Sequence, residues 1–95
     1  MVKFYAPWCG HCKRLIPVWE ELSELFKDDA QVAISSVDCT KHKPVCDKAA
    51  VRGFPTIMSY YGGAAKEQYK GARTKESLRD FTTQQKLLNL AETVA

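Results

Sequence analysis

Hydrophobic positions in the first part of the chain predict a strand followed by a helix. Val2 to Tyr5 is a short run of β-prone residues, and Pro7 comes soon after it to end a strand. From there on, apolar residues recur at steps of three and four, which is helical spacing. They are Leu15, Ile16, Val18, Trp19, Leu22, Leu25 and Phe26. Pro17 lies inside this stripe and should kink the helix, which residues 27–29 end.

Apolar runs and breakers continue through the middle of the chain. Residues 32–37 predict a second strand that is buried on both faces near its start. Pro44 suits the first position of a short helix that runs to about Ala50. Arg52-Gly53-Phe54-Pro55 then breaks the chain before a third predicted strand over residues 56–61.

A hairpin and a final helix complete the expected elements. Gly62-Gly63 is a turn signal, and the returning strand is expected over residues 66–69. Thr74 can cap a helix after it, and residues 87–95 either extend that helix or form a linker. The order β-α-β, short helix, β-β-α predicts an α/β fold. Its sheet is mixed, because a right-handed β-α-β crossover pairs parallel strands and a hairpin adds antiparallel ones, with helices on both faces.

Composition limits the possible functions. The 95 residues suit one small domain, the formal net charge is +3, and no apolar run is long enough to span a bilayer. Lys41, His42, Lys43 and Lys48 form a basic cluster without interleaved aromatic residues. A nucleic-acid-binding face is usually more basic, so the cluster is interpreted as solvated surface. No nucleic-acid partner is expected.

Candidate chemistry centres on Trp8-Cys9-Gly10-His11-Cys12, where the first strand meets the helix. The free N–H groups and partial positive charge of a helix start stabilise a thiolate, so Cys9 is the expected nucleophile. Gly10 and His11 complete the turn, and His11 can further favour the thiolate. Cys12, one turn into the helix, should be less exposed and should resolve a mixed disulfide. A thiolate stabilised in this way makes the disulfide a better oxidant.

A zinc site is the alternative interpretation of a C-x-x-C pair, with His11 or His42 and the other cysteines as further ligands. Zinc knuckles normally place such pairs in turns between short strands, and not at the head of a long amphipathic helix. No metal and no cofactor are therefore expected.

The segment Phe4-Tyr5-Ala6-Pro7-Trp8-Cys9-Gly10-His11-Cys12-Lys13 resembles the active-site stretch of protein disulfide isomerase family domains, which have a thioredoxin-like fold. The resemblance continues through Pro17, Val37-Asp38-Cys39-Thr40, Val51-Arg52-Gly53-Phe54-Pro55-Thr56 and Gly71-Ala72-Arg73, and covers almost the whole chain. The cysteines around Asp38 are most similar to endoplasmic-reticulum thioredoxin-domain-containing proteins.

This resemblance implies further site residues. Pro55 matches the family's cis-proline beside the cysteine pair, although a trans turn proline is the more common state of any proline. The backbone of Phe54 would then bind an extended client peptide by strand addition. The place of Trp8 beside the nucleophile indicates by itself a flat wall near bound substrate, and Trp8 can at the same time be a core aromatic residue. Arg73 matches a loop arginine that is thought to swing toward Cys12. By its sequence alone, Arg73 is a surface residue before a helix cap.

Cys39 and Cys46 are separate from the C-x-x-C motif. Four cysteines allow three pairings, which the sequence does not decide. A structural disulfide between these two is the preferred interpretation, because the loop that it closes is short and the compartment implied by the resemblance is oxidising. Two buried free thiols, or an auxiliary redox pair, are the alternatives.

The sequence departs from the family pattern at two places. Lys3 stands where many family domains carry a buried acid that accepts the proton of Cys12, so Lys3→Glu is expected to speed the resolving step. The family's usual first strand and helix are not seen before Val2, which would leave residues 32–37 as an exposed edge strand. The chain carries neither a signal peptide nor a retention sequence, and it is interpreted as part of a longer precursor.

The expected function is that of a thiol–disulfide oxidoreductase that forms or isomerises disulfides in client proteins. Residues 1–86 are expected to form the thioredoxin-like catalytic domain, and 87–95 the helix extension or linker. The implied partners are misoxidised or unfolded polypeptides and a reoxidising partner or glutathione, and the implied compartment is the lumen of the endoplasmic reticulum. The alternatives are a thioredoxin-type reductase, which typically has proline in place of His11, and a substrate-binding module of a larger chaperone.

Overall fold

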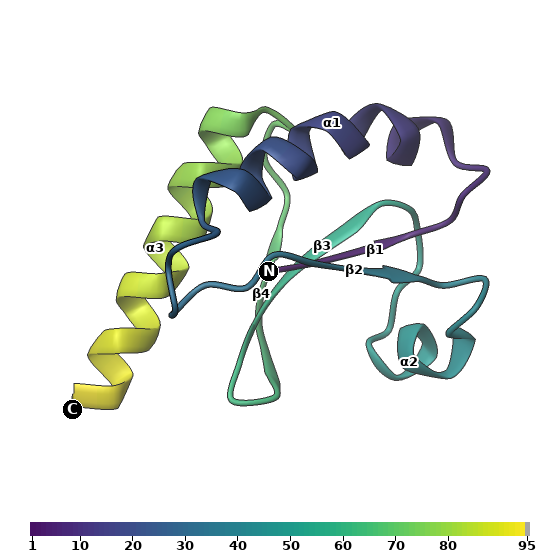
Figure 1. Ribbon diagram of the computed structural model, residues 1–95. Coiled ribbons are helices and arrows are strands. Elements are labelled where there is room, and N and C mark those ends of the chain that lie inside the picture. The colour runs from purple at the N-terminus through teal and green to yellow at the C-terminus, as the bar shows by residue number, and fades with distance from the viewer. Residues whose placement is uncertain (95) are drawn as a thin grey trace.

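The computed structural model describes residues 1–94, which form a four-stranded sheet and three helices. In chain order the elements are β1 (Val2–Tyr5), α1 (Gly10–Leu25), β2 (Ser35–Asp38), α2 (Lys43–Lys48), β3 (Thr56–Tyr61), β4 (Ala64–Tyr69) and α3 (Lys75–Val94). The strand order is β2-β1-β3-β4 (Figure 1). β1 and β2 are parallel, whereas β1–β3 and β3–β4 are antiparallel. The predicted mixed α/β sheet is confirmed.

Helices cover both faces of the sheet, as predicted (Figure 1). On one face, α1 and α3 pack on β3 through a cluster that includes Leu15, Ile57 and Leu78. On the other face, Phe4 packs with Cys39 and Cys46, which lie at the end of β2 and in α2. Side chains alternate between the two faces along a strand, so neighbouring residues of β1 belong to different layers.

α1 forms where the apolar stripe predicts a helix. Its buried residues Cys12, Leu15, Trp19 and Leu22 follow one another at steps of three, four and three, which places them on the face toward the sheet. The indole of Trp19 donates a hydrogen bond to the carbonyl oxygen of Ser35 at 3.1 Å. The stripe therefore holds the start of α1, and Cys12 with it, against the sheet.

The hairpin between β3 and β4 turns at the two glycines. Gly62 and Gly63 have φ angles of 60° and 79°, which a two-residue turn of type I′ requires and which glycine adopts without steric cost. β4 begins directly after them at Ala64, two residues earlier than the sequence indicates. The pairing of Tyr61 with Ala64 closes the turn.

The prediction for the second strand is wrong in its bounds and in its burial. β2 begins at Ser35, because its register pairs Val2 with Ser35, so residues 32–34 lie before the ladder. Ser35 and Ser36 are exposed, since β2 is the edge of the sheet within the described residues and has a neighbour on one side only. The sequence pattern of 32–37 resembles a buried strand because Val32 and Ile34 are apolar, yet both are only half-buried.

α3 continues beyond residue 86 without a break, so Leu87, Leu88 and Leu90 belong to the helix and not to a linker. Thr74 caps its start as predicted, because the Thr74 hydroxyl accepts a hydrogen bond from the backbone N–H of Ser77 at 3.2 Å. Within residues 1–94, no helix combines the length and the apolar character that a membrane span needs.

Candidate active site

Cys9 lies between the end of β1 and the first residue of α1, as the N-cap of that helix. Its φ and ψ of −78° and 122° are extended, so the chain turns into the helix at this residue. The Cys9 sulfur accepts a hydrogen bond from the backbone N–H of Cys12 at 3.3 Å. A cysteine thus occupies the position where helices prefer an acceptor side chain, and its sulfur accepts from one of the N–H groups that a helix start leaves without a partner in the helix.

This position lowers the pKa of Cys9 below its ordinary value. The largest cause is the hydrogen bond from the Cys12 thiol, and burial acts in the opposite direction. The backbone N–H groups of Cys12 and His11 and the positive charge of Arg73 lower the pKa further. A lower pKa raises the fraction of thiolate, which is the nucleophilic form.

Cys12 has the opposite character. It is 2% exposed, and burial is the main cause that raises its pKa, followed by its hydrogen bond to Cys9. Both cysteines are free thiols in the structure. The two pKa values are therefore shifted in opposite directions. As the pH rises, Cys9 loses its proton before Cys12, which stays a thiol.

Phe54 and Pro55 lie against the cysteine pair. The peptide bond between them is cis, and the Cys9 thiol lies 3.6 Å from the carbonyl oxygen of Phe54, to which it donates a hydrogen bond. The Phe54 ring packs edge-on against Trp8, with ring centroids 5.8 Å apart. Trp8 is 69% exposed, so its flat face is open to solvent beside Cys9. Residues 45 positions apart in the sequence thus meet at one sulfur.

His11 and Arg73 are exposed residues that both act on Cys9. His11 contributes its backbone N–H to Cys9, while its ring Nδ1 lies 2.9 Å from the Arg14 guanidinium. The positive charge of Arg73 acts on Cys9 in this structure. Gly10 begins α1 and is exposed, with no atom within 4 Å of the place where a Cβ would lie.

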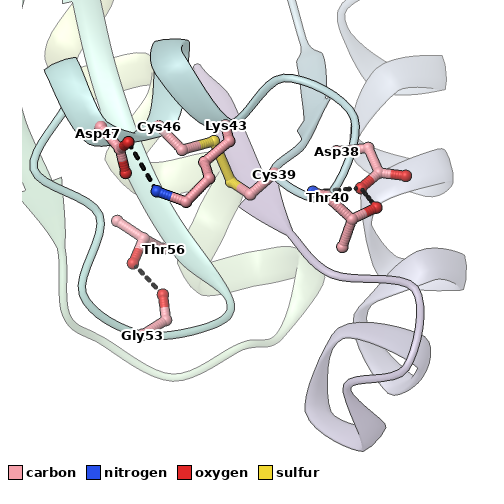
Figure 2. Close-up of a disulfide and its surroundings, with 8 residues drawn as sticks. All are labelled: Asp38, Cys39, Thr40, Lys43, Cys46, Asp47, Gly53 and Thr56. Atoms are coloured by element: carbon pink, nitrogen blue, oxygen red, sulfur yellow. Dashed lines mark hydrogen bonds and ion pairs between the residues drawn. A yellow bond between two sulfur atoms is a disulfide. The ribbon is translucent and has the colours of Figure 1, made fainter.

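Cys39 and Cys46 are joined by a disulfide with an S–S distance of 2.11 Å (Figure 2). It connects the residue after β2 to α2, where Lys43 and Asp47 form an ion pair at 2.9 Å. Asp38 begins the connecting loop by accepting hydrogen bonds from the backbone and the hydroxyl of Thr40. Among the described residues, no group of three or more His, Cys, Asp or Glu side chains is arranged to hold a metal ion.

Sequence reasoning missed one member of the site, Ala6, and the packing of the predicted residue Phe54 against both cysteine pairs. Ala6 is fully buried in one cluster with both cysteines, and its backbone N–H favours the Cys12 thiolate. Phe54 packs against both the Cys9–Cys12 cluster and the Cys39–Cys46 cluster, so one side chain connects the two cysteine pairs. No local pattern shows these contacts, since they depend on how β1, α1 and the 49–55 loop meet.

A dithiol at a helix N-cap, beside a cis-proline and on this mixed sheet, defines a thioredoxin-like protein. Residues 1–84 match the profile of the family described as Thioredoxin. The chain belongs to this thioredoxin family.

Among curated proteins, it is 44% identical over 91 residues to "Protein disulfide isomerase-like 2-1" of Oryza sativa subsp. japonica, covering 95% of this chain and 25% of that protein. It is 45% identical over 82 residues to "Thioredoxin domain-containing protein 5 homolog" of Drosophila melanogaster, covering 84% of this chain and 20% of that protein. These relatives agree with the resemblance seen in the motif.

Among solved structures, human ERp44 superposes with a TM-score of 0.85 at 33% identity, over 90% of this chain and 26% of that one. The chain thus spans about a quarter of the length of these proteins.

Proposed function

We propose that this chain is a thiol–disulfide oxidoreductase that forms or isomerises disulfides in client polypeptides. The observation that carries this proposal is the place of the two thiols: Cys9 is the N-cap of α1 and accepts a hydrogen bond from the backbone N–H of Cys12, whose own thiol is buried behind it in the helix, so that Cys9 is equipped to attack and Cys12 to resolve. The protein disulfide isomerase-like names of the relatives support it. His11, which replaces the proline typical of reductases, favours oxidation and shuffling over reduction.

When the dithiol is reduced, the Cys9 thiolate attacks one sulfur of a client disulfide and releases the other client sulfur as a thiolate. Cys12 then loses its proton, attacks the Cys9 sulfur and releases the client's second thiolate. The client disulfide has taken up two electrons, and Cys9 and Cys12 are joined. Client oxidation is the reverse sequence, in which a client thiolate attacks Cys9 of the disulfide form and Cys12 leaves.

The client is proposed to lie as an extended peptide along the exposed backbone near Phe54 and Pro55. Phe54 directs its carbonyl oxygen to Cys9, and Trp8 offers an open aromatic surface next to it. Backbone hydrogen bonds recognise a strand with little regard to its sequence, which suits an enzyme with many clients.

Compartment and partners belong to the same proposal. A cysteine pair that donates its disulfide to clients must be reoxidised, which needs an oxidising compartment. The Cys39–Cys46 disulfide also persists best in such a compartment. The lumen of the endoplasmic reticulum meets both needs, with glutathione or a reoxidising protein to restore the Cys9–Cys12 disulfide.

Refolding of scrambled ribonuclease A by the 95-residue chain tests this function. Cys9→Ser should abolish the regain of ribonuclease activity, and Cys12→Ser should accumulate a mixed disulfide between Cys9 and the client. Lys13→Met changes an exposed residue beside the motif and serves as the matched control. Unchanged refolding by Cys9→Ser would instead support a substrate-binding module without redox action.

A further inference from the structure

Lys3 is a buried lysine in β1, the strand that leads into the cysteine motif. It is 5% exposed, which is unusual for a lysine without a specific role. In the β1–β3 ladder Lys3 pairs with Ile57, and cross-strand partners point to the same face of a sheet. Ile57 belongs to the cluster between the sheet and the α1–α3 layer, so Lys3 extends into that layer and toward α1.

Aromatic rings hold the Lys3 ammonium group in place. Its Nζ lies 5.1 Å from the ring centroid of Tyr5 and 5.8 Å from that of Trp19. A cation over such rings is partly compensated for its lost hydration. Tyr5 itself packs against the cluster that contains Cys12, and Trp19 follows Cys12 by two helical turns on the buried face of α1. The Lys3 ammonium group is therefore buried among residues that pack near Cys12, and the two groups act on each other electrostatically.

We propose that the Lys3 ammonium group stabilises the Cys12 thiolate and so sets the rate of the step in which Cys12 resolves the mixed disulfide. The inference rests on the proposed oxidoreductase function. Cys12 first gives its thiol proton to water. The bond formed is between the sulfurs of Cys9 and Cys12, and the bond broken joins Cys9 to the client sulfur, which leaves as a thiolate and takes a proton from water. Lys3 stays protonated throughout.

The same charge acts in the oxidising direction, where Cys12 is the leaving group. A leaving thiolate departs faster when it is stabilised. Lys3 acts through Cys12 and does not touch the client, so it is a positioning residue. In this chain a positive charge would serve where a proton-accepting acid stands in many related domains.

The charges around the pair agree with this role. Burial raises the pKa of Cys12, and the Lys3 charge opposes that rise. Burial lowers the pKa of Lys3, while Cys12 and the carboxylate of Glu20 raise it. The Glu20 carboxylate therefore competes with Cys12 for the same cation. Cys9 disfavours the Cys12 thiolate, and Arg73 acts on Cys9.

Rapid-quench mixing of the reduced chain with excess glutathione disulfide tests the inference. Acid quenching, alkylation and mass spectrometry count two species, Cys9 bound to glutathione and the Cys9–Cys12 disulfide. Their interconversion is the resolving step, and its rate is measured from pH 5 to 9. Cys39 and Cys46 stay bonded and do not interfere.

Lys3→Met keeps an unbranched side chain between the two rings but removes the charge. It should move the midpoint of the resolving step upward by about one pH unit and slow that step about tenfold at pH 7. Lys3→Arg should restore most of the rate, and the exposed control Lys13→Met should match the wild type. A Lys3→Met variant with the wild-type midpoint would overturn the inference.

Glu20→Gln provides a test that does not disturb the buried layer, since Glu20 is exposed. Removing the competing carboxylate should move the midpoint downward, and an unchanged or higher midpoint would contradict the inference. Lys3→Glu is less suitable, because a carboxylate at this place can itself accept the Cys12 proton.

This experiment distinguishes a failure of the proposed oxidoreductase function from a failure of the proposed role of Lys3. If glutathione never becomes attached to Cys9, the proposed oxidoreductase function fails. If it attaches at the wild-type rate and only the resolving step ignores Lys3, the function stands and the role of Lys3 is wrong.

Discussion

Removal of the Cys39–Cys46 disulfide should destabilise the chain by an amount that its topology sets. The double variant Cys39→Ala/Cys46→Ala opens a loop whose ends are seven residues apart. In the chain-entropy description, closing a loop of about eight residues lowers the entropy of the unfolded state by roughly 8 cal/mol/K, which is about 2.5 kcal/mol at 25 °C. For a domain of this size, that loss corresponds to a fall in Tm of about 10–20 °C.

Packing adds to this entropic effect. Both cysteines are buried, in a cluster with Phe4, and the half-buried Phe54 packs against it. The backbone N–H of Val51 donates to the Cys46 carbonyl at 3.0 Å, so the disulfide also anchors the start of the segment that carries Phe54. The free energy of unfolding is therefore expected to fall by somewhat more than the loop-closure entropy alone predicts.

Urea unfolding followed by circular dichroism measures this loss. Val45→Ala is the matched control, because Val45 is exposed in the same helix and its change should shift the free energy of unfolding by less than about 0.5 kcal/mol. If the double variant unfolds with the same free energy as Val45→Ala, then the disulfide does not stabilise the fold and the reasoning is refuted.

Three further results are expected. Alkylation by iodoacetamide, mapped by peptide, should modify Cys9 at lower pH than Cys12, because the pKa of Cys9 is lowered and that of Cys12 is raised; equal profiles would contradict this. The Lys86 hydrogen bond lowers the pKa of Asp29, so its stabilisation should be complete at pH 7 and disappear as the pH falls below about 4. Asp29→Asn should thus be less stable than the wild type at pH 7 and equal to it near pH 2 in thermal melts. Ala50→Gly should raise the free energy of unfolding by up to about 1 kcal/mol, because Ala50 has a φ of 59°; a decrease would count against strain there.

The sequence was sufficient for those elements whose signals are local. The third strand occupies its predicted residues, 56–61, because its β-prone run is bounded by breakers on both sides. Gly62-Gly63 predicted the turn because few other residues adopt two positive φ angles in succession. The start of β2 could not be predicted in this way. Strand ends depend on which neighbour is present, and the register with β1 begins pairing at Ser35.

In the candidate active site, too, the local features could be predicted from the sequence and the contacts between distant residues could not. The motif predicts that a cysteine meets the start of a helix, and the structure has Cys9 as the N-cap of α1. It does not predict that the carbonyl of Phe54 meets the Cys9 sulfur, because that contact joins residues 45 apart. It also does not show that Arg73 acts on Cys9, or that the Lys3 ammonium group lies near the rings of Tyr5 and Trp19 and acts on Cys12. These contacts arise from packing between layers, which no local pattern records.

The reduction potential of the Cys9–Cys12 couple tests the proposed function most directly. The chain is equilibrated in glutathione buffers of known ratio, and alkylation with peptide mapping counts this couple separately from Cys39 and Cys46. The account predicts a value nearer to about −180 mV, as in protein disulfide isomerase, than to about −270 mV, as in thioredoxin. A value near −270 mV would make the chain a reductase and contradict the role given to His11. The absence of any reversible Cys9–Cys12 couple would contradict oxidoreductase function altogether.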